Sequence, residues 1–323
     1  MWGLNFASGV NNNPFLPAFC RDSPGFSDLL FLGLVHAQTV EALKSEEIRQ
    51  AVRIALQEDL GPGDVTTEAT IPEEMTATAE LRAREPLVLA GLAFAETAFH
   101  ELSPAVRFTR TVSDGKNVAT KKSILQITGP ARALLSAERV ALNFVQRLSG
   151  IATLTAQFVQ AVEGTAARIL DTRKTTPGWR RFEKYAVSCG GGRNHRMGLY
   201  DMVLVKDNHL AALKHESPNA IAAAIERARA RHPTLKIEVE ADTLEQVDQA
   251  AAAGCDLILL DNMNPVQLRL AVQRCKSRCQ TEASGGITLA TVRAIAETGV
   301  DFISIGALTH SARAVDIGLD FVL

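Results

Sequence analysis

Three features are scarce in this sequence: paired cysteines, long apolar runs and an excess of either charge. Its five cysteines are odd in number and form no C-x-x-C pair, which favours reduced thiols over a disulfide framework or a zinc site. No apolar run approaches the roughly 20 residues that a membrane-spanning helix needs. The 34 Lys and Arg residues nearly balance 36 Asp and Glu residues, so no general attraction to nucleic acid or to an anionic membrane is expected. We therefore expect a cytoplasmic protein that binds neither.

Charge is scarcest in the first 40 residues, which contain only Arg21, Asp22 and Asp28. The segment Leu29–Val35 faintly resembles the apolar part of a signal peptide, but it is short, lies deep in the chain and has no basic segment before it. We predict a poorly ordered extension over residues 1–45.

The rest of the chain is long enough for two domains, and the composition of the protein, 46% hydrophobic and 22% charged, is ordinary for a globular protein. We predict a first α/β domain over residues 46–150. Its expected elements are helices at Glu46–Leu60 and Ala90–Leu102 and strands at Thr76–Ala83, Val106–Val112 and Ser123–Ile127, with turn signals between them. A helical pattern then runs from Ala131 to Val162, and Gly150 is expected to break it into two helices.

Residues 151–323 form the predicted second domain, in which strand and helix patterns alternate. The candidate strands are Arg168–Leu170, Met202–Val205, Lys236–Val239, Leu257–Leu260, Thr281–Glu282 and Phe302–Ile305, and the candidate helices are Ala220–Arg231, Leu244–Ala253, Pro265–Arg274 and Leu289–Thr298. Repeated strand–helix units predict a parallel barrel or a doubly wound sheet.

Polar or glycine-rich residues directly follow almost every candidate strand, and this favours the barrel. In a parallel α/β barrel these positions meet on one rim, where active sites lie. No G-x-G-x-x-G motif follows the first strand, which argues against a dinucleotide-binding sheet.

Cationic side chains are concentrated between Asp171 and His209, where eight Lys and Arg residues accompany four Asp and Glu residues. Such a cluster in a nearly neutral protein indicates a concave site for a small polyanion. The candidate anion binders are Arg173, Lys174, Arg196 and Lys206, with His195 as a hydrogen-bonding group or an acid. Arg180, Arg181, Lys184 and Arg193 are expected to be solvated, and Cys189 is expected to be a bystander thiol.

Two carboxylates, Glu240 and Asp261, follow neighbouring strands at the same rim. They could hold sugar hydroxyls, bind Mg²⁺ directly or through water, or stabilise a developing cation. Lys236 and Glu238 share the strand face of Glu240. The alternative is a solvated charge at the end of the barrel, an interpretation favoured more for Glu238 than for Asp261.

Two glycine-containing segments follow the last two strands: Ser284-Gly285-Gly286, before a helix expected near Leu289, and Gly306-Ala307. Glycine lets the backbone approach a ligand closely, and barrel phosphate sites are often built from the last two such loops. Carboxylates, a phosphate cradle and surplus cations together indicate group transfer from a phosphorylated sugar. The chemistry alone leaves the transferred group open.

In addition, the sequence resembles the quinolinate phosphoribosyltransferase family, also called carboxylating nicotinate-nucleotide pyrophosphorylases. The segments that carry the resemblance are ALQEDLGPGDVTT (55–67), AERVALNFVQRLSGIAT (137–153), DTRKTTPG (171–178), GGGRNHRMGL (190–199), VKDNH (205–209), EVE (238–240), LLDN (259–262), SGGI (284–287) and IGALTHS (305–311).

The resemblance implies an enzyme that converts quinolinate and phosphoribosyl pyrophosphate to nicotinate mononucleotide, pyrophosphate and CO₂, with Mg²⁺, in NAD biosynthesis. It implies an N-terminal α/β sandwich, an incomplete, open α/β barrel as in type II phosphoribosyltransferases, and a C-terminal end that can pack back on the first domain. It also implies homodimers with shared active sites and leaves a hexamer open.

The resemblance further assigns roles by motif. Arg139 would enter the partner's site; Thr172, Arg173, His195, Arg196 and Lys206 would bind quinolinate; and Lys174 would lie beside that pocket and the pyrophosphate. Glu240 and Asp261 would face the ribose hydroxyls and, mostly indirectly, the metal, while Ser284, Gly285, Gly286, Ile305, Gly306 and Ala307 would cradle the 5-phosphate. The implied catalytic set is Lys174, Lys206, Glu240 and Asp261.

Three alternatives remain. One is a related phosphoribosyltransferase on the same fold that acts on nicotinate or another small anion, or a molybdenum-associated relative. Another is an aldolase that forms a Schiff base through Lys206. The third is a non-catalytic protein that binds a phosphorylated sugar, which the pair of Glu240 and Asp261 disfavours.

Overall fold

The computed structural model describes residues 43–322. The predicted extension, except for its last three residues, and the signal-like segment Leu29–Val35 lie outside this range. None of the helices in the described range combines the length and apolar character that a membrane crossing requires.

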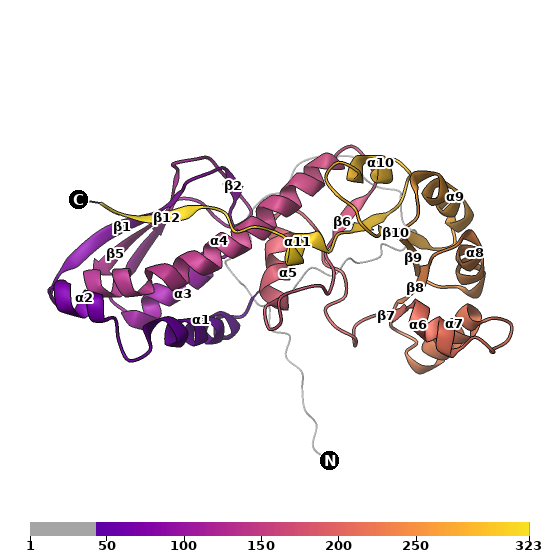
Figure 1. Ribbon diagram of the computed structural model, residues 1–323, viewed down its shortest axis with the longest axis horizontal. Coiled ribbons are helices and arrows are strands. Elements are labelled where there is room, and N and C mark those ends of the chain that lie inside the picture. Colours follow the sequence, from indigo (N-terminus) through magenta and orange to yellow (C-terminus); the bar gives the residue numbers. More distant parts are fainter. Residues whose placement is uncertain (1–42, 323) are drawn as a thin grey trace, which may run out of the picture. The chain divides into compact units, whose positions relative to one another are not determined.

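The first layer is a four-stranded antiparallel sheet in the order β12-β1-β5-β3. Three strands come from the N-terminal half of the chain, β1 (Thr76–Ala83), β3 (Arg107–Arg110) and β5 (Ser123–Pro130), whereas β12 (Ile317–Val322) is the C-terminal strand. Figure 1 shows β12 beside β1, with which it pairs in antiparallel register. Alternate residues Ala79, Leu81 and Ala83 of β1 are fully buried, as a sheet with one covered face requires.

Shorter elements complete this part of the fold. The helices are α1 (Ser45–Leu60), α2 (Val65–Thr70) and α3 (Leu92–Leu102), and a two-stranded ribbon pairs β2 (Leu87–Val88) with β4 (Asn117–Val118). The predicted helix at Ala90–Leu102 therefore starts two residues later than expected, after Gly91, whose backbone is left-handed (φ +98°).

The longest element, α4 (Ala131–Ala161), is one continuous helix, so the predicted break at Gly150 is wrong. A Cβ atom at Gly150 would overlap the carbonyl oxygen of Arg313, so this glycine is explained by close packing of another backbone segment. α4 packs on α1, α3, β1 and β5, and also on α5 (Arg180–Cys189) and β6 (Arg168–Leu170). It therefore runs without interruption across the predicted domain boundary at residue 150.

Six parallel strands form the second sheet, in the order β6-β11-β10-β9-β8-β7. The strands after β6 are β7 (Val203–Val205), β8 (Ile237–Ala241), β9 (Leu257–Asp261), β10 (Gln280–Ser284) and β11 (Phe302–Ser304). The last strand pairs back with the first, but no pairing joins β6 to β7 in the described chain. The sheet is therefore an open parallel barrel, which confirms the expected fold class.

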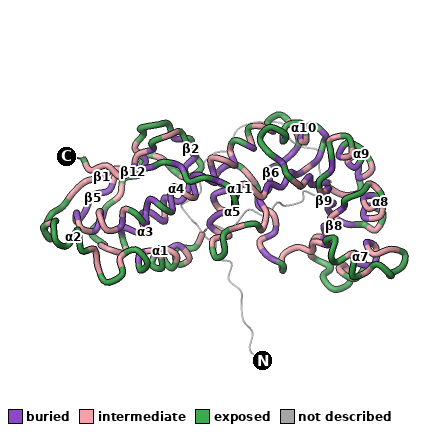
Figure 2. Tube along the Cα trace, viewed as in Figure 1, coloured by how far each residue is buried: buried purple, intermediate pink, exposed green. Residues whose placement is uncertain are grey.

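Three helices cover the outside of this sheet: α7 (Ala220–Arg231), α8 (Leu244–Ala253) and α9 (Pro265–Cys275) (Figure 1). Each begins at a polar side chain that accepts backbone N–H hydrogen bonds from the first turn, namely Asn219, Thr243 and Asn264. Figure 2 shows the strands beneath them as largely buried. Leu257, Ile258, Leu259 and Leu260 of β9 are all buried, as expected for a strand covered on both faces.

The open edge between β6 and β7 is occupied by a loop that follows α5. Arg193 forms a parallel bridge with Leu170, its N–H donates to the Ile169 carbonyl (2.8 Å), and its carbonyl accepts the Asp171 N–H (3.1 Å). The preceding glycines allow this approach, because a Cβ at Gly190 would overlap the Ala152 carbonyl of α4. We call this segment, residues 192–196, the seam loop; it carries His195 and Arg196.

Candidate active site

The carboxyl ends of the barrel strands enclose a cavity of about 780 Å³. Fourteen of the fifteen side chains and glycines predicted to bind substrate line it: Thr172, Arg173, Lys174, His195, Arg196, Lys206, Glu240, Asp261, Ser284, Gly285, Gly286, Ile305, Gly306 and Ala307. The structure also adds residues that were not predicted, among them Asn262, Glu282, Ser304 and His310.

Arg139 is the predicted site residue that does not line this cavity. It is exposed on α4 and forms no ion pair or hydrogen bond with another described residue.

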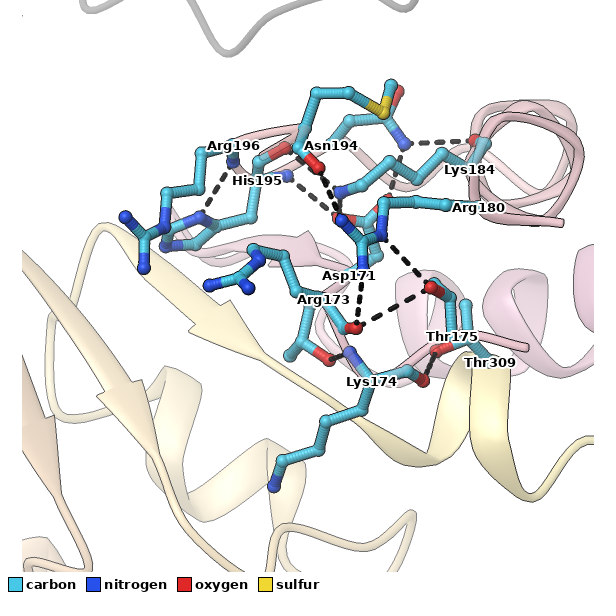
Figure 3. A network of polar contacts seen from close by, with 12 residues as sticks. Asp171, Arg173, Lys174, Thr175, Arg180, Lys184, Asn194, His195, Arg196 and Thr309 are labelled. Atoms are coloured by element: carbon cyan, nitrogen blue, oxygen red, sulfur yellow. Dashed lines mark hydrogen bonds and ion pairs between the residues drawn. The ribbon is translucent and has the colours of Figure 1, made fainter. Parts of the chain in front are cut away.

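Three cations in the cavity have no anionic partner. Arg173, Lys174 and Arg196 form no ion pair with a carboxylate of residues 43–322, and the buried Nε of Arg173 has no hydrogen-bond partner there. Figure 3 shows the Arg173 and Arg196 side chains extending in the same direction. Burial lowers the pKa of Arg196, and the neighbouring positive charge of Arg173 lowers it further. Two adjacent guanidinium groups, neither of them ion-paired with a carboxylate of the described residues, make a candidate anion site.

The loop that carries Arg173 and Lys174 is fixed by its backbone. Arg180, at the start of α5, donates to the carbonyl of Met197 (3.0 Å), to the Arg173 carbonyl (3.4 Å) and to the Thr175 hydroxyl (3.1 Å). The buried Thr309 hydroxyl donates to the Lys174 carbonyl at 2.7 Å (Figure 3). The charged ends of Arg173 and Lys174 therefore remain available to a ligand while their backbone is held.

A buried ion pair forms hydrogen bonds with the seam loop and holds it in place. Asp171, at the end of β6, pairs with Lys184 of α5, and both side chains are fully buried. Asp171 also accepts the Asn194 amide (2.6 Å) and the His195 N–H (2.9 Å), while Lys184 donates to the His195 carbonyl (3.0 Å). Burial raises the pKa of Asp171 and lowers that of Lys184, and their attraction opposes both shifts.

The expectation that Lys184 is solvated is therefore wrong. It lies on a helix that was not predicted, α5, which packs against α4. Arg180 likewise serves as a backbone anchor, whereas Arg193 is exposed as expected.

The carboxylate side of the cavity contains Glu240 at the end of β8 and Asp261 at the end of β9. Glu240 forms an ion pair with Lys206, and the Asn262 amide donates to Asp261 at 2.6 Å. Oxygens of Glu240, Asp261 and the exposed Asp242 lie within 4.8 Å of one another. The structure thus pairs Lys206, predicted as an anion binder, with one of the predicted catalytic carboxylates.

The glycine loops line the cavity between the carboxylates and Lys174. Gly285 and Gly286 have left-handed backbones (φ +100° and +59°), and a Cβ at Gly285 would overlap the Asn262 side chain. The N–H groups of these two glycines and of Ile287 donate no hydrogen bond to other described residues. The predicted helix at Leu289–Thr298 is wrong in extent, because α10 spans only Val292–Ala296. Loop amides, rather than that helix start, therefore face the cavity.

After the other loop, a four-residue helix, α11 (Ala307–His310), follows Gly306 directly. Gly306 itself is packed by two cavity residues, since a Cβ there would lie 3.0 Å from the Lys174 side chain and 3.1 Å from that of His310. Any larger residue at position 306 would therefore push against the side chains of Lys174 and His310.

Two buried carboxylates were missed as site residues. Glu238 of β8 and Glu282 of β10 are fully buried beside His195, so the solvated interpretation of Glu238 is wrong. The sequence did indicate that Glu238 belongs to the site, because it shares a strand face with Glu240 and that face points into the barrel.

An open parallel barrel that brings unpaired cations, carboxylates and glycine loops together on one rim has the layout of an enzyme active site. The profile of the quinolinate phosphoribosyl transferase C-terminal domain matches residues 151–320, and that of the N-terminal domain matches residues 64–149. The chain belongs to the quinolinate phosphoribosyltransferase family.

Individual relatives agree with this assignment. The chain is 46% identical over 278 residues to the carboxylating nicotinate-nucleotide pyrophosphorylase of Mycobacterium leprae, covering 84% of this chain and 96% of that protein. It is 44% identical to the probable enzyme of the same name from Bacillus subtilis, covering 82% of this chain and 90% of that protein. The solved nicotinate-nucleotide pyrophosphorylase from Francisella tularensis superposes with a TM-score of 0.83 at 37% identity, covering 88% of this chain and 99% of that one.

Proposed function

We propose that this protein transfers the phosphoribosyl group of phosphoribosyl pyrophosphate to quinolinate with loss of CO₂, forming nicotinate mononucleotide and pyrophosphate for NAD biosynthesis. The observation that carries the proposal is the set of unpaired cations, Arg173, Lys174 and Arg196, in one cavity. These cations match a pyridine dicarboxylate, because Arg can bind each carboxylate with two parallel hydrogen bonds.

The opposite side of the cavity suits the sugar phosphate. Bond formation at the ribose passes through a state with positive charge on the ring, which the fixed carboxylates of Glu240 and Asp261 stabilise electrostatically. The free N–H groups of Gly285 and Gly286 suit the 5-phosphate.

Decarboxylation follows from the new bond. Once the pyridine nitrogen is alkylated, its positive charge stabilises the electron pair left at the ring carbon when CO₂ departs. That carbon then takes up a proton from solvent water. Arg173 and Arg196 then need only hold the ring in place, so their contribution is positioning rather than proton transfer.

Mg²⁺ is the cofactor that we propose. The clustered oxygens of Glu240, Asp242 and Asp261 are the hard donors that Mg²⁺ prefers, and they fit a site in which some ligands are water or substrate oxygens. Bound there, the metal would neutralise charge on the departing pyrophosphate.

The alternative substrates are less well matched. Nicotinate has one carboxylate, so it would leave part of the cation set unused. A human nicotinic acid phosphoribosyltransferase has a similar fold, at 13% identity and a TM-score of 0.52, and this similarity says nothing about the substrate of the present chain.

An aldolase that forms a Schiff base is also poorly matched. Lys206 is half-exposed and paired with Glu240, whereas a Schiff-base lysine is typically desolvated or beside another cation.

Steady-state turnover with phosphoribosyl pyrophosphate and Mg²⁺ tests the proposal. We expect CO₂ release and nicotinate mononucleotide formation with quinolinate, and no turnover with nicotinate. Turnover of nicotinate in preference to quinolinate would contradict it, and trapping of a carbonyl substrate on Lys206 by borohydride would favour an aldolase.

We further propose a homodimer in which Arg139 of each subunit completes the other's cavity, with a hexamer as a possible higher assembly, and a cytoplasmic location. The homodimer is supported by the exposed position of Arg139 outside its own cavity. The cytoplasmic location is supported by the free thiols of four cysteines: Cys189, Cys255, Cys275 and Cys279.

A further inference from the structure

Two fully buried carboxylates meet one histidine at the floor of the cavity. We call His195, Glu238 and Glu282 the acid cluster. The Nε2 atom of His195 lies 3.0 Å from Glu238 Oε2 and 3.5 Å from Glu282 Oε2. Neither contact has the alignment of a hydrogen bond, and the four carboxylate oxygens have no hydrogen-bond partner within residues 43–322. Such unsatisfied buried groups are costly and need an explanation.

A metal ion does not explain the acid cluster. The other ring nitrogen of His195, Nδ1, accepts the N–H of Arg196 at 2.7 Å. The neutral ring therefore carries its proton on Nε2, the nitrogen that faces the two carboxylates. A metal-binding histidine needs the opposite arrangement, with Nε2 free and a proton on Nδ1 that donates to a neighbour.

A retained proton explains the cluster better. Two carboxylates this close in a buried site cannot both be ionised at low cost. Burial and the charge of Glu238 raise the pKa of Glu282 to about 8, so Glu282 is the neutral member near neutral pH. Burial lowers the pKa of His195, whereas the charges of Glu282 and Glu238 raise it, Glu282 the most. When Glu282 keeps its proton, that largest raising charge is absent, and the ring stays neutral with Nδ1 free to accept a hydrogen bond. Added protonation at Nδ1 would break the bond to Arg196.

Other charges face His195 as well. Lys184 lies behind the seam loop and opposes protonation of the ring, while Asp171 holds the His195 N–H. Arg196 is adjacent in the chain and Arg173 lies next to Arg196. Both His195 and Glu282 line the cavity, so the acid cluster connects the interior of the barrel with the anion-binding cations.

On the basis of the proposed function, we propose that Glu282, together with Glu238, is a positioning residue for quinolinate. The two carboxylates contact the His195 ring from inside the barrel, at 3.0 and 3.5 Å from Nε2, and limit its position. The Nδ1 atom of the ring accepts the backbone N–H of Arg196. Arg196 is thereby fixed at the cavity wall.

Glu282 must keep its proton in this arrangement. Ionisation would place a second negative charge beside Glu238 and close to the site of a dianionic substrate. Quinolinate affinity should therefore be full below the pKa of Glu282 and should fall as the pH rises through it.

The test compares Glu282→Ala, Glu282→Gln and the control Glu297→Gln, which removes an exposed charge of the same domain from α10. The KM values for quinolinate and for phosphoribosyl pyrophosphate would be measured at about pH 7 and about pH 9.5, on either side of the relevant pKa. We expect Glu282→Ala to raise the quinolinate KM about tenfold with little change in the other KM. Glu282→Gln, which has the shape of the neutral acid, should raise it less.

The pH dependence provides the second readout. Wild type and Glu297→Gln should lose quinolinate affinity at the higher pH, and Glu282→Gln should lose much less. An alkaline loss in Glu282→Gln equal to that of wild type would overturn the inference, and so would an equal rise of both KM values in Glu282→Ala. If Glu282→Ala does not fold, the comparison of Glu282→Gln with wild type decides alone. Failure of the wild-type protein to use quinolinate would instead reject the proposed function.

Discussion

The carboxylate of Asp171 and the backbone N–H of His195 lie 2.9 Å apart, and this hydrogen bond joins the end of β6 to the seam loop. The barrel is open at this point, since β6 and β7 are not paired in the described chain. The seam loop takes the place of a neighbouring strand, and it brings His195 and Arg196 to the rim. Because the barrel is open there, the seam loop can contribute His195 and Arg196 to the anion site.

The Asp171→Asn variant should be strongly destabilised, because it leaves the ammonium of Lys184 buried without a counter-charge. Removal of one partner of a buried pair typically costs about 3–5 kcal/mol. Urea unfolding would measure the loss, and the quinolinate KM of the folded fraction should rise because the seam loop loses a fixed acceptor. A change below about 0.5 kcal/mol, the range of ordinary surface substitutions, would show that the pair is not needed.

Much of the site could be predicted from sequence because one rule covers it. Residues directly after parallel strands meet on one rim, so Arg173, Lys206, Glu240 and Asp261 could be grouped without knowledge of the packing. A parallel barrel with outer helices followed from the same repeated pattern, whereas its open form was implied by the resemblance. The motif resemblance supplied what spacing alone left open, namely the substrates and the role proposed for Arg139.

The errors have a common physical origin in tertiary packing. Lys184, Glu238 and Glu282 have side chains that are usually exposed, and only the surrounding elements show that they are buried. A helix break is predicted at Gly150 because glycine disfavours a helix interior. The actual role of this glycine is to leave room for the backbone at Arg313, 163 residues further along the sequence. The pairing of β12 with β1 also joins opposite ends of the described chain. No local pattern could predict this pairing, and the resemblance implied only that the C-terminal end can pack back on the first domain.

Replacement of Arg173 by Ala should abolish detectable quinolinate binding and leave the fold intact, because its guanidinium faces the cavity and forms no ion pair with other described residues. Isothermal titration calorimetry with quinolinate would measure the binding, and circular dichroism the fold. Arg168→Ala is a matched control, since Arg168 is exposed at the other end of β6. Unchanged affinity in Arg173→Ala would reject the assignment of this cavity to the dicarboxylate.

Chelation of divalent cations should stop turnover, and added Mg²⁺ should restore it. In the Asp261→Asn variant, the Mg²⁺ concentration for half-maximal velocity should rise about tenfold or more, as expected when a ligand or its positioning partner is lost. Quinolinate binding measured without metal should stay close to that of wild type, because Asp261 lies on the other side of the cavity from Arg173. An unchanged Mg²⁺ dependence would remove Asp261 from the metal site. Glu245→Gln, an exposed charge on α8, serves as the control.

The Gly150→Ala variant should lose stability although the residue lies in the middle of a helix. Alanine in a helix interior ordinarily stabilises by roughly 0.5–1 kcal/mol relative to glycine. Here the added methyl group would overlap the Arg313 carbonyl, so α4 or the segment that leads to β12 must shift, at a cost of about 1–3 kcal/mol. Thermal unfolding would show the sign directly. A raised melting temperature would mean that the two segments are not in close contact in solution.

Arg139→Ala and Lys206→Ala should each be inactive alone and should recover activity when mixed. In a mixed dimer with shared sites, the cavity of the Arg139→Ala subunit keeps Lys206 and receives the intact Arg139 of its partner. Equal mixing makes half of the dimers mixed, so about a quarter of all cavities should be complete, given the two-fold symmetry of such a dimer. Mass spectrometry would verify subunit exchange, and a mixture of Arg173→Ala with Lys206→Ala is the control, since both changes lie in the same cavity and no complete one can form. Exchange without recovery of activity would show that each cavity works with its own chain.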